Sequence, residues 1–308
     1  MKNESNILFD RRAMLGLTAT ALAGSLTACT EATRAATQPA LVNRQRFTNK
    51  VVVITGATSG IGRAAALQFA AEGAKVGFCG RRENLGHEVE NEIKAHGGEA
   101  TYIRADVRNE SDVKAFIDKV VQKYGGLHVA FNNAGITLEK ALHEYTSQEW
   151  DDVIHTNQRG VFLAMKYEIP YMLANGGGNI VVTSSSNAIA TTENRSAYSA
   201  SKRGLVGLVQ SAALDYAAKG IRVNALIPGT TDTPMVRRMA GMEHAPDAVW
   251  ELAAKQWAKS NVPGMRRMAT PEEIAAFALV LASDDHPYMT GAQMVIDGGK
   301  TAHSGSSR

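Results

Sequence analysis

Cysteine is scarce in this chain of 308 residues, and its scarcity excludes one way of holding a fold together. The two cysteines are Cys29 and Cys79, so no disulfide framework is expected. Histidine and cysteine nowhere cluster at the spacing of metal ligands, so the sequence predicts no metal site. We interpret Cys79, inside an apolar run, as a core residue of a strand rather than as a redox thiol.

An excess of charge of one sign is lacking, and so are long apolar runs. The 33 basic and 30 acidic residues are mixed along the chain and give a formal net charge of +3. No basic block with interleaved aromatics indicates a nucleic-acid partner, and no apolar run reaches the roughly 18 residues of a membrane-spanning helix. A hydrophobic content of 44% still allows a full core, and the uniform composition after residue 50 indicates one domain.

The first fifty residues do not share the pattern of the rest. Arg11-Arg12 precede a short, mildly apolar segment that ends at Ala28, and this order is typical of an export signal. The arginine pair resembles a twin-arginine signal, whose pathway carries folded proteins. Leu26-Thr27-Ala28-Cys29 resembles the lipobox of bacterial lipoproteins, in which the cysteine is lipidated. Asp10 and Gly16 depart from the twin-arginine consensus.

These features divide the chain into four parts. We expect an export signal over residues 1–29, a flexible tether over 30–47, a folded domain over 48–300 and a tail over 301–308. The signal predicts a location on the periplasmic side of a bacterial cell envelope, with a lipid anchor at Cys29. A cytoplasmic protein with a disordered leader, or with a mis-assigned start codon, is the alternative.

From Val51 onward, short β-branched runs alternate with helical patterns. Such alternation predicts an α/β fold, a parallel sheet of about seven strands with helices on both faces. Ligands of such sheets bind at the carboxyl ends of the strands. The segment 231–264 breaks the rhythm and is either plain helical packing or a mobile lid. The expected strands are 51–54, 75–79, 101–103, 127–131, 179–183, 222–227 and 293–296, and the expected helices include 63–72, 83–95, 111–124, 197–218 and 271–282.

The first strand ends in the glycine-rich turn Thr55-Gly56-Ala57-Thr58-Ser59-Gly60-Ile61-Gly62. The glycines let the backbone approach a ligand that a Cβ would block. The N–H groups and the positive dipole end of the following helix favour a diphosphate. The spacing differs from the common dinucleotide fingerprint Gly-x-Gly-x-x-Gly, and a purely structural turn is the alternative.

Tyr198 and Lys202 lie four residues apart, and on a helix they share one face. A nearby cation favours the phenolate, so this pair can move a proton to or from an alcohol or ketone oxygen. Upstream, Ser184-Ser185-Ser186 follows a predicted strand, where a hydroxyl can hydrogen-bond a developing oxyanion. Taken singly, the tyrosine–lysine pair could also be an ordinary pair on a helix surface. The serine run could also be a polar loop that follows a strand.

Taken together, these motifs resemble the short-chain dehydrogenase/reductase superfamily over residues 48–299. The resemblance includes the glycine turn, Asn132-Asn133-Ala134-Gly135 after the fourth strand, Asn157, the serine run and the Tyr198/Lys202 pair. It continues through Pro228-Gly229, Thr233, Thr290-Gly291 and Asp297-Gly298-Gly299. It implies a single-domain, Rossmann-like doubly wound sheet.

The resemblance also implies roles for individual residues. Tyr198 would be the general acid or base, Lys202 would hold the nicotinamide ribose and lower the pKa of the tyrosine, and Ser185 would bind the substrate oxygen. Asn157 would support a water-linked proton path to Lys202, or else be an ordinary helix-interior asparagine. Asp106 would meet the adenine, or else be a turn aspartate. The implied cofactor-binding residues are Thr55, Gly56, Ser59, Gly60, Ile61, Gly62, Arg81, Arg82, Asp106, Val107, Asn133, Ala134, Gly135, Tyr198, Lys202, Pro228, Gly229 and Thr233.

The cofactor preference depends on the end of the second strand. An acidic residue there would accept hydrogen bonds from the ribose hydroxyls and repel a 2′-phosphate. This sequence instead has Gly80-Arg81-Arg82, and the two arginines can clamp a phosphate. Arg63 is expected to add charge. The sequence therefore favours NADP(H), with NAD(H) as the alternative if the arginines only stack on adenine or face water.

The sequence thus predicts an oxidoreductase that interconverts a secondary alcohol and a ketone by direct hydride transfer. Two alternatives keep the fold: a dinucleotide-sensing protein without turnover, and an epimerase or dehydratase. The resemblance also implies a homodimer or homotetramer built on the helices that contain Asn157 and Tyr198. The substrate itself is not identified by the sequence.

The lipobox hypothesis gives the first testable prediction. In the full-length chain expressed in a bacterium that processes lipoproteins, Cys29→Ala should abolish membrane association, because it removes the site of acylation. Fractionation followed by immunoblotting measures this, with Cys79→Ala as the control. An unchanged distribution of Cys29→Ala would refute the anchor.

Overall fold

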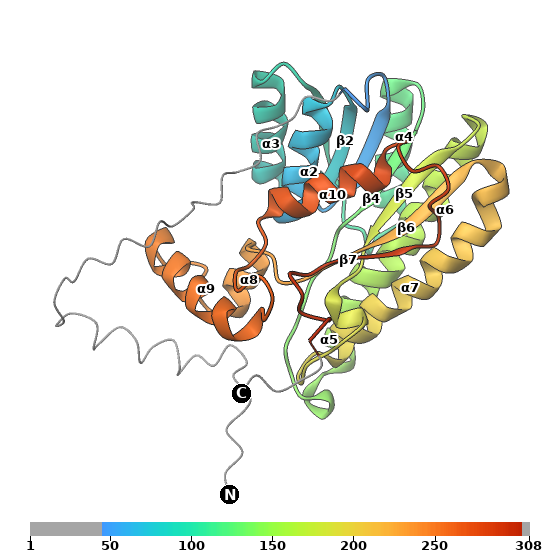
Figure 1. The fold of residues 1–308 in the computed structure, drawn as a ribbon. Helices are drawn as coiled ribbons and strands as arrows, with labels where there is room; N and C mark the ends of the chain where they lie inside the picture. The colour runs from blue at the N-terminus through green and yellow to red at the C-terminus, as the bar shows by residue number, and fades with distance from the viewer. Residues whose placement is uncertain (1–44, 304–308) are drawn as a thin grey trace, which may run out of the picture.

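The computed structural model describes residues 45–303, so the predicted export signal and all but the last residues of the predicted tether lie outside the described residues. Within that range, seven strands form one sheet in the order β3-β2-β1-β4-β5-β6-β7 (Figure 1). Every neighbouring pair is parallel. The strands are β1 (Val51–Thr55), β2 (Lys75–Gly80), β3 (Glu99–Arg104), β4 (Val129–Asn132), β5 (Gly178–Thr183), β6 (Ile221–Pro228) and β7 (Gln293–Ile296).

Helices connect the strands and cover both faces of the sheet (Figure 1). The α-helices are α2 (Gly60–Ala71), α3 (Glu83–Ala95), α4 (Glu110–Tyr124), α5 (Ser147–Ile154), α6 (Gly160–Ala174), α7 (Ser196–Tyr216), α8 (Pro234–Met239), α9 (Asp247–Asn261) and α10 (Pro271–Ala282). A π-helical turn, η2 (His155–Arg159), joins α5 to α6, and 3₁₀ turns occur at η1 (Leu142–Glu144), η3 (Ser186–Ala188) and η4 (Ala217–Lys219).

The doubly wound α/β fold predicted from the sequence is confirmed. Each predicted strand is present, and the boundaries move by two residues at most. The predicted start of α10 is correct in detail: Thr270 caps the helix, Pro271 is its first residue, and Glu273 completes a capping box with Thr270.

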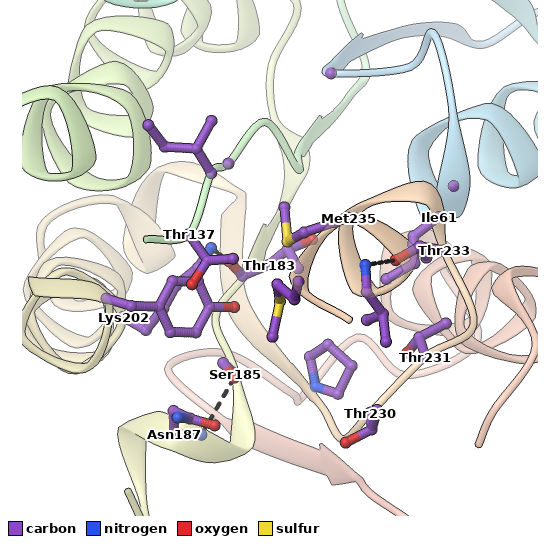
Figure 2. Close-up of a pocket in the computed structure, with 18 of the residues that line it drawn as sticks. Ile61, Thr137, Thr183, Ser185, Asn187, Lys202, Thr230, Thr231, Thr233 and Met235 are labelled. Carbon is purple, nitrogen blue, oxygen red and sulfur yellow. Dashed lines mark hydrogen bonds between the residues drawn. The ribbon is translucent and has the colours of Figure 1, made fainter. Parts of the chain in front are cut away.

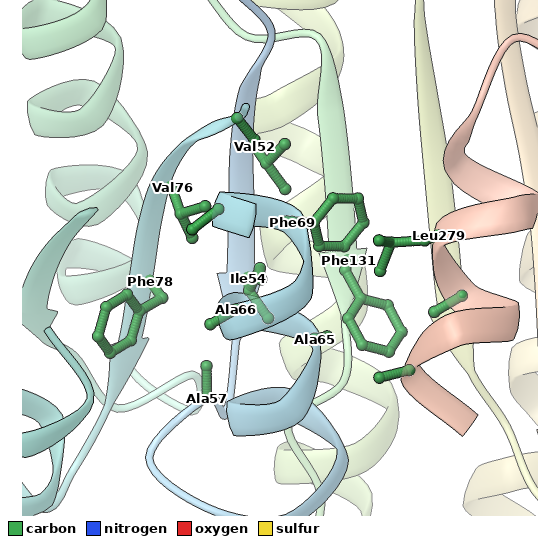
Figure 3. Close-up of a cluster of buried hydrophobic side chains, with 14 of the residues drawn as sticks. Val52, Ile54, Ala57, Ala65, Ala66, Phe69, Val76, Phe78, Phe131 and Leu279 are labelled. Carbon is green, nitrogen blue, oxygen red and sulfur yellow. The ribbon is translucent and has the colours of Figure 1, made fainter. Parts of the chain in front are cut away.

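Alternation along the strands sends side chains to two separate cores. Val52 and Ile54 of β1 point to one face, where they meet Phe131 of β4 and residues of α2, α3 and α10 (Figure 3). Val51 and Val53 point to the opposite face, against α4, α6 and α7. Because both faces are covered, β1 is buried along its whole length, as a central parallel strand must be.

The packed chain begins slightly before the predicted boundary at residue 48. Arg46 donates two hydrogen bonds of 2.6 Å to the carboxylate of Glu72 at the end of α2. The buried ring of Phe47 packs edge-on against Phe69 at 4.8 Å between ring centroids. These contacts attach the last residues of the predicted tether to the domain.

The segment 231–264 folds into α8 and α9, which have a small core of their own. Trp250 is fully buried there, and its indole N–H donates to Asp232 at 2.8 Å. Arg237 lies 5.3 Å from the Trp250 ring and pairs with Asp247. The segment therefore packs as a unit beside the sheet (Figure 1) rather than as part of its two main cores.

Two further observations apply to residues 45–303. None of their helices is long and apolar enough to span a membrane, and none of their histidine, cysteine, aspartate and glutamate side chains gather into a group of three or more that could hold a metal ion. Cys79 is a buried free thiol in β2, and burial raises its pKa to about 12, which makes it a poor nucleophile.

Candidate active site

A large cleft opens where the strand order reverses, between β1 and β4. Connections from these two strands leave in opposite directions, so the loops at their carboxyl ends separate and leave space. The cleft has a volume of about 2010 Å³. The serine run after β5, α7, the loop after β6 and α8 supply its other walls (Figure 2).

The glycine turn closes one end of the cleft and fits a diphosphate. Gly56 has a φ of +72°, and a Cβ on it would lie 2.6 Å from the Cα of Ala134. The turn leads into α2, whose N-cap Ser59 makes no side-chain capping bond and whose first turn holds no acidic residue. Gly60 and Ile61 of that first turn line the cleft. The N-terminal N–H groups are therefore left for an anion.

Two of the predicted cofactor-binding residues lie behind the cleft wall instead of on it. Thr55 is buried, and its Oγ1 accepts bonds from the N–H groups of Asn133 and Ala134 at 3.1 and 3.2 Å. A Cβ on Gly62 would lie 2.4 Å from the carbonyl oxygen of Gly56. Both residues hold the glycine turn against the loop after β4, and their predicted contact with a cofactor stays a prediction.

Asn157 also lies outside the cleft lining, within the π-helical turn η2. Its Oδ1 accepts from the N–H of Ile136 at 2.8 Å, and its Nδ2 donates to the Ile136 carbonyl at 2.9 Å and to Ser201 Oγ at 3.0 Å. A Cβ on Gly135 would lie 3.3 Å from Asn157 Oδ1 and 3.5 Å from Lys202 Nζ. Asn157 is therefore a neighbour of Lys202, and the bonds that it makes tie the loop after β4 to α7.

Ser185, Tyr198 and Lys202 meet on one wall of the cleft. Ser185 follows β5, where its Oγ accepts from the N–H of Asn187 at 3.2 Å (Figure 2). Tyr198 lies in the first turn of α7, and Lys202 follows one turn later. The buried ammonium of Lys202 donates to the carbonyl of Thr183 at 2.7 Å and lies 5.8 Å from the centre of the tyrosine ring.

Burial is the largest effect on the pKa values of this wall. Burial raises the pKa of Tyr198, and a hydrogen bond from Ser185 and the charge of Arg195 oppose that rise without reversing it. Burial also lowers the pKa of Lys202 to about 8. A lysine with a pKa of about 8 is still mostly an ammonium at neutral pH, so the effect of Lys202 on the pKa of Tyr198 stays a prediction.

A cluster of arginines marks the opposite end, beyond β2. Arg82 donates to Thr58 Oγ1 at 2.9 Å and to Ser59 Oγ at 2.7 Å. Burial lowers its pKa first, and the charges of Arg238 and Arg81 lower it further. All three arginines line the cleft, and among residues 45–303 none of them pairs with a carboxylate. The cluster fits an anionic group.

Two other charges near this end form ion pairs with side chains around them. Arg63 pairs with Glu92 and does not line the cleft, so its expected contribution is corrected. Asp106 does line the cleft, but its carboxylate accepts hydrogen bonds from the guanidinium of Arg108, the shortest at 2.7 Å. These bonds keep the pKa of Asp106 below its usual range against the effect of burial.

Behind the switch point lies a buried carboxyl group that sequence reasoning missed. Glu168 of α6 is fully buried, and one of its oxygens accepts from Asn132 Nδ2 at 2.9 Å. Its other oxygen and Asn132 Oδ1 have no partner. Burial raises the pKa of Glu168 to about 8, so the group is largely protonated at neutral pH.

Most of the remaining predicted residues are brought together by the fold. The ones that line the cleft are Gly56, Ser59, Gly60, Ile61, Arg81, Arg82, Asp106, Val107, Asn133, Ala134, Gly135, Ser185, Tyr198, Lys202, Pro228, Gly229 and Thr233. Sequence reasoning missed five charged residues on the same walls, Glu139, Glu193, Arg195, Arg238 and Lys300. None of them belongs to a motif that the sequence analysis used.

Comparisons with known proteins agree with this geometry. A family model described as enoyl-(acyl carrier protein) reductase matches residues 56–301. A cyclohexanol dehydrogenase from Acinetobacter sp. (strain SE19) is 39% identical over 258 residues, 83% of this chain and 97% of that protein. A 3β-hydroxysteroid dehydrogenase from Mediterraneibacter gnavus is 38% identical over 270 residues, 84% of this chain and 97% of that protein. The crystal structure of levodione reductase matches with a TM-score of 0.76 and 35% identity, over 83% of this chain and 99% of that one.

Glu168 gives a prediction about stability and pH. Between about pH 5 and 8 the folded protein holds a proton that the unfolded chain has released, so the unfolding free energy falls as pH rises, on the order of 1 kcal/mol per pH unit. Above pH 8 this contribution levels off. Glu168→Gln stays neutral and should lose this pH dependence. Urea unfolding from pH 5 to 8.5 measures it, with exposed Glu88→Gln as the control; a slope equal to that of the wild type would contradict the assignment.

Proposed function

Because the chain belongs to the short-chain dehydrogenase/reductase superfamily, we propose that it is an NADP(H)-preferring oxidoreductase that interconverts a secondary alcohol and a ketone. Relatives are named for cyclohexanol, for a 3β-hydroxysteroid and for levodione. These names support a substrate whose alcohol carbon belongs to a ring or lies next to one. The enzyme class follows from the family; the substrate and the cofactor preference are our proposal.

One observation carries the proposal: Ser185, Tyr198 and Lys202 share the cleft into which the uncapped start of α2 opens. A diphosphate bound at the start of α2 and a substrate ring bound at Tyr198 would therefore occupy one continuous cleft. A purely structural tyrosine–lysine pair would have no reason to lie there. The buried ammonium of Lys202, bonded to the Thr183 carbonyl at 2.7 Å, adds a fixed donor on the same wall.

Bound NADP(H) supplies or accepts the hydride at the substrate carbon. In ketone reduction, Ser185 Oγ donates a hydrogen bond to the carbonyl oxygen, and Tyr198 gives its phenolic proton to that oxygen as the alcohol forms. In alcohol oxidation the phenolate takes the proton back. Lys202 stabilises the phenolate when its ammonium is charged, and its hydrogen bond to Thr183 fixes its place. Lys202 is buried, and Tyr198 is half-buried on the wall of the cleft.

The preference for NADP(H) rests on Arg81, Arg82 and Arg238. A 2′-phosphate among these three cations would relieve their mutual repulsion and accept several charge-assisted hydrogen bonds. Gly80 has no carboxylate that could accept hydrogen bonds from the ribose hydroxyls. A side chain at this position would clash, because a Cβ on Gly80 would lie 2.6 Å from Thr58 Cγ2. Arg238 belongs to α8, so the wall formed by α8 and α9 would contact the cofactor through it.

We further propose export to the periplasmic side of a bacterial envelope and assembly into a homodimer or homotetramer. The export proposal rests on the arginine pair and the lipobox-like segment alone. The assembly proposal is supported by apolar side chains exposed on α6 and α7, namely Phe162, Leu173 and Leu214. Sedimentation equilibrium tests it, and a monomer mass would overturn it.

Tyr198→Phe tests the reaction. Removing the phenolic proton should lower kcat/KM for ketone reduction by about 10²-fold or more, while the affinity for NADPH stays unchanged. Loss of NADPH absorbance with a panel of ring ketones measures turnover, and protein fluorescence measures binding. Tyr216→Phe, near the far end of α7, is the matched control. Activity retained in Tyr198→Phe would refute the role of the tyrosine, and cofactor binding without turnover of any ketone by the wild type would favour a sensor.

Arg82→Gln tests the cofactor preference without needing a substrate. We expect the wild type to bind 2′,5′-ADP more tightly than 5′-AMP, and Arg82→Gln to weaken only 2′,5′-ADP, by about tenfold. Arg238→Gln should act in the same direction. Arg237→Gln is the control from the same helix, because Arg237 pairs with Asp247 instead. Titration calorimetry gives the affinities, and equal affinity of the wild type for both nucleotides would overturn the preference.

A further inference from the structure

Three segments meet on the cleft wall beside Tyr198. They are the loop after β4, the loop before α7, and the chain that follows β7. The first two are joined by an isolated β-bridge between Lys140 and Arg195, and the Lys140 N–H donates to the Asn194 carbonyl at 3.1 Å. The third contributes Lys300, directly after Gly298-Gly299. The fold therefore holds these segments together next to the proposed reacting atoms.

Arg195 stands at the N-cap position of α7, three residues before Tyr198. Its side chain is 14% exposed, and its guanidinium pairs with Glu139. Its Nε is buried without a hydrogen-bond partner. Arg195 and Tyr198 line the same cleft, and the charge of Arg195 acts to lower the pKa of Tyr198. Arg195 thus lies on the same wall as the proposed reacting atoms. Its Nε is a hydrogen-bond donor that Glu139 does not occupy.

Lys300 lines the same cleft as Arg195 and has no counter-ion of its own. Its Nζ makes no hydrogen bond and no ion pair among residues 45–303. Its pKa is lowered, first by burial and then by the charge of Arg195, while Asp297 opposes with a smaller effect. The carboxylate of Asp297 is occupied by the N–H of Gly299 at 2.9 Å and by the hydroxyl and N–H of Thr301 at 2.6 and 2.8 Å. The attraction it offers Lys300 does not cancel the repulsion from Arg195.

Lys300 is the cation of this corner that no carboxylate pairs with among residues 45–303. Arg195 and Lys300 contribute two cations and Glu139 one anion. The other carboxylates that line the cleft within the described chain are Glu193, which is exposed, and Asp106, which binds Arg108 after β3. The charges that act on Arg82 are those of Arg238 and Arg81, so the corner is separate from the arginines assigned to the cofactor.

We propose that Arg195 and Lys300 form a subsite for a carboxylate of the substrate, so that the protein acts on a hydroxy acid and the corresponding oxo acid. The inference rests on the proposed function and specifies its substrate class. A carboxylate between the two cations would relieve their repulsion and accept hydrogen bonds from both side chains. A neutral substrate would leave a desolvated ammonium uncompensated, and a cationic one would be repelled.

The carboxylate takes no part in the bond changes. In reduction, hydride adds to the ketone carbon, the C=O π bond opens, and the oxygen takes the proton of Tyr198, giving the secondary alcohol with the carboxylate unchanged. Arg195 and Lys300 orient the substrate by its other end, which brings the ketone to Tyr198 in one pose. Orientation of this kind raises kcat/KM for the substrate that carries the carboxylate.

The test compares 4-oxocyclohexane-1-carboxylate with its carboxamide, which has nearly the same shape and no charge. We expect the wild type to prefer the carboxylate in kcat/KM by about tenfold. In Lys300→Met the preference should fall to near one, and in Lys300→Glu it should reverse, because the corner then carries an excess negative charge. Lys119→Met removes an exposed lysine of α4 and should keep the wild-type preference.

A second measurement separates this proposal from the proposed function. Titration calorimetry with cyclohexanecarboxylate and cyclohexanecarboxamide requires no turnover. The wild type should bind the carboxylate about tenfold more tightly than the carboxamide, and Lys300→Met should bind the two equally. Turnover of ketones with equal preference for both compounds, together with equal affinity, would overturn the subsite and leave the oxidoreductase intact. Selective carboxylate binding without turnover of any ketone would support the subsite and refute the oxidoreductase.

Discussion

The close approach of Gly56 to Ala134 is the constraint on which the rest of the cleft depends. At this point the chain leaving β1 and the chain leaving β4 touch, and a Cβ on Gly56 would lie 2.6 Å from the Cα of Ala134. Thr55 stabilises the contact by accepting two backbone N–H groups from the loop after β4. Because β1 and β4 are the central neighbours at the reversal of strand order, the contact sets both the start of α2 and the position of Gly135 beside Lys202.

Much of this arrangement could be predicted from local sequence. Runs such as Val51-Val52-Val53-Ile54 fix the strands because β-branched residues fit a buried parallel sheet. The capping box of Thr270 and Glu273 fixes the start of α10 because its bonds are local. Tyr198 and Lys202 could be paired because one helical turn separates them. Ser185 and the glycine turn needed the resemblance, since a serine run and a glycine-rich turn are ambiguous on their own.

What the sequence could not predict depends on contacts between distant segments. Asn157 lies in a π-helical turn and ties the loop after β4 to α7 through hydrogen bonds to Ile136 and Ser201. No local sequence pattern predicts these bonds. Arg195 and Lys300 are far apart in the sequence and meet only because the loop before α7 and the chain after β7 converge. The net direction of the pKa shift of Tyr198 could not be derived from the sequence, because the effect of burial, which depends on the whole fold, exceeds that of the neighbouring groups.

Cationic side chains line both ends of the cleft. Each end holds a cation that no carboxylate pairs with among residues 45–303: Arg81, Arg82 and Arg238 beyond β2, and Lys300 beside Tyr198. Between them lies Lys202, whose pKa burial lowers to about 8. An anion bound near any of these groups favours their charged forms. An anionic ligand beside Lys202 would therefore favour its ammonium form, the form that the proposed proton transfer at Tyr198 uses.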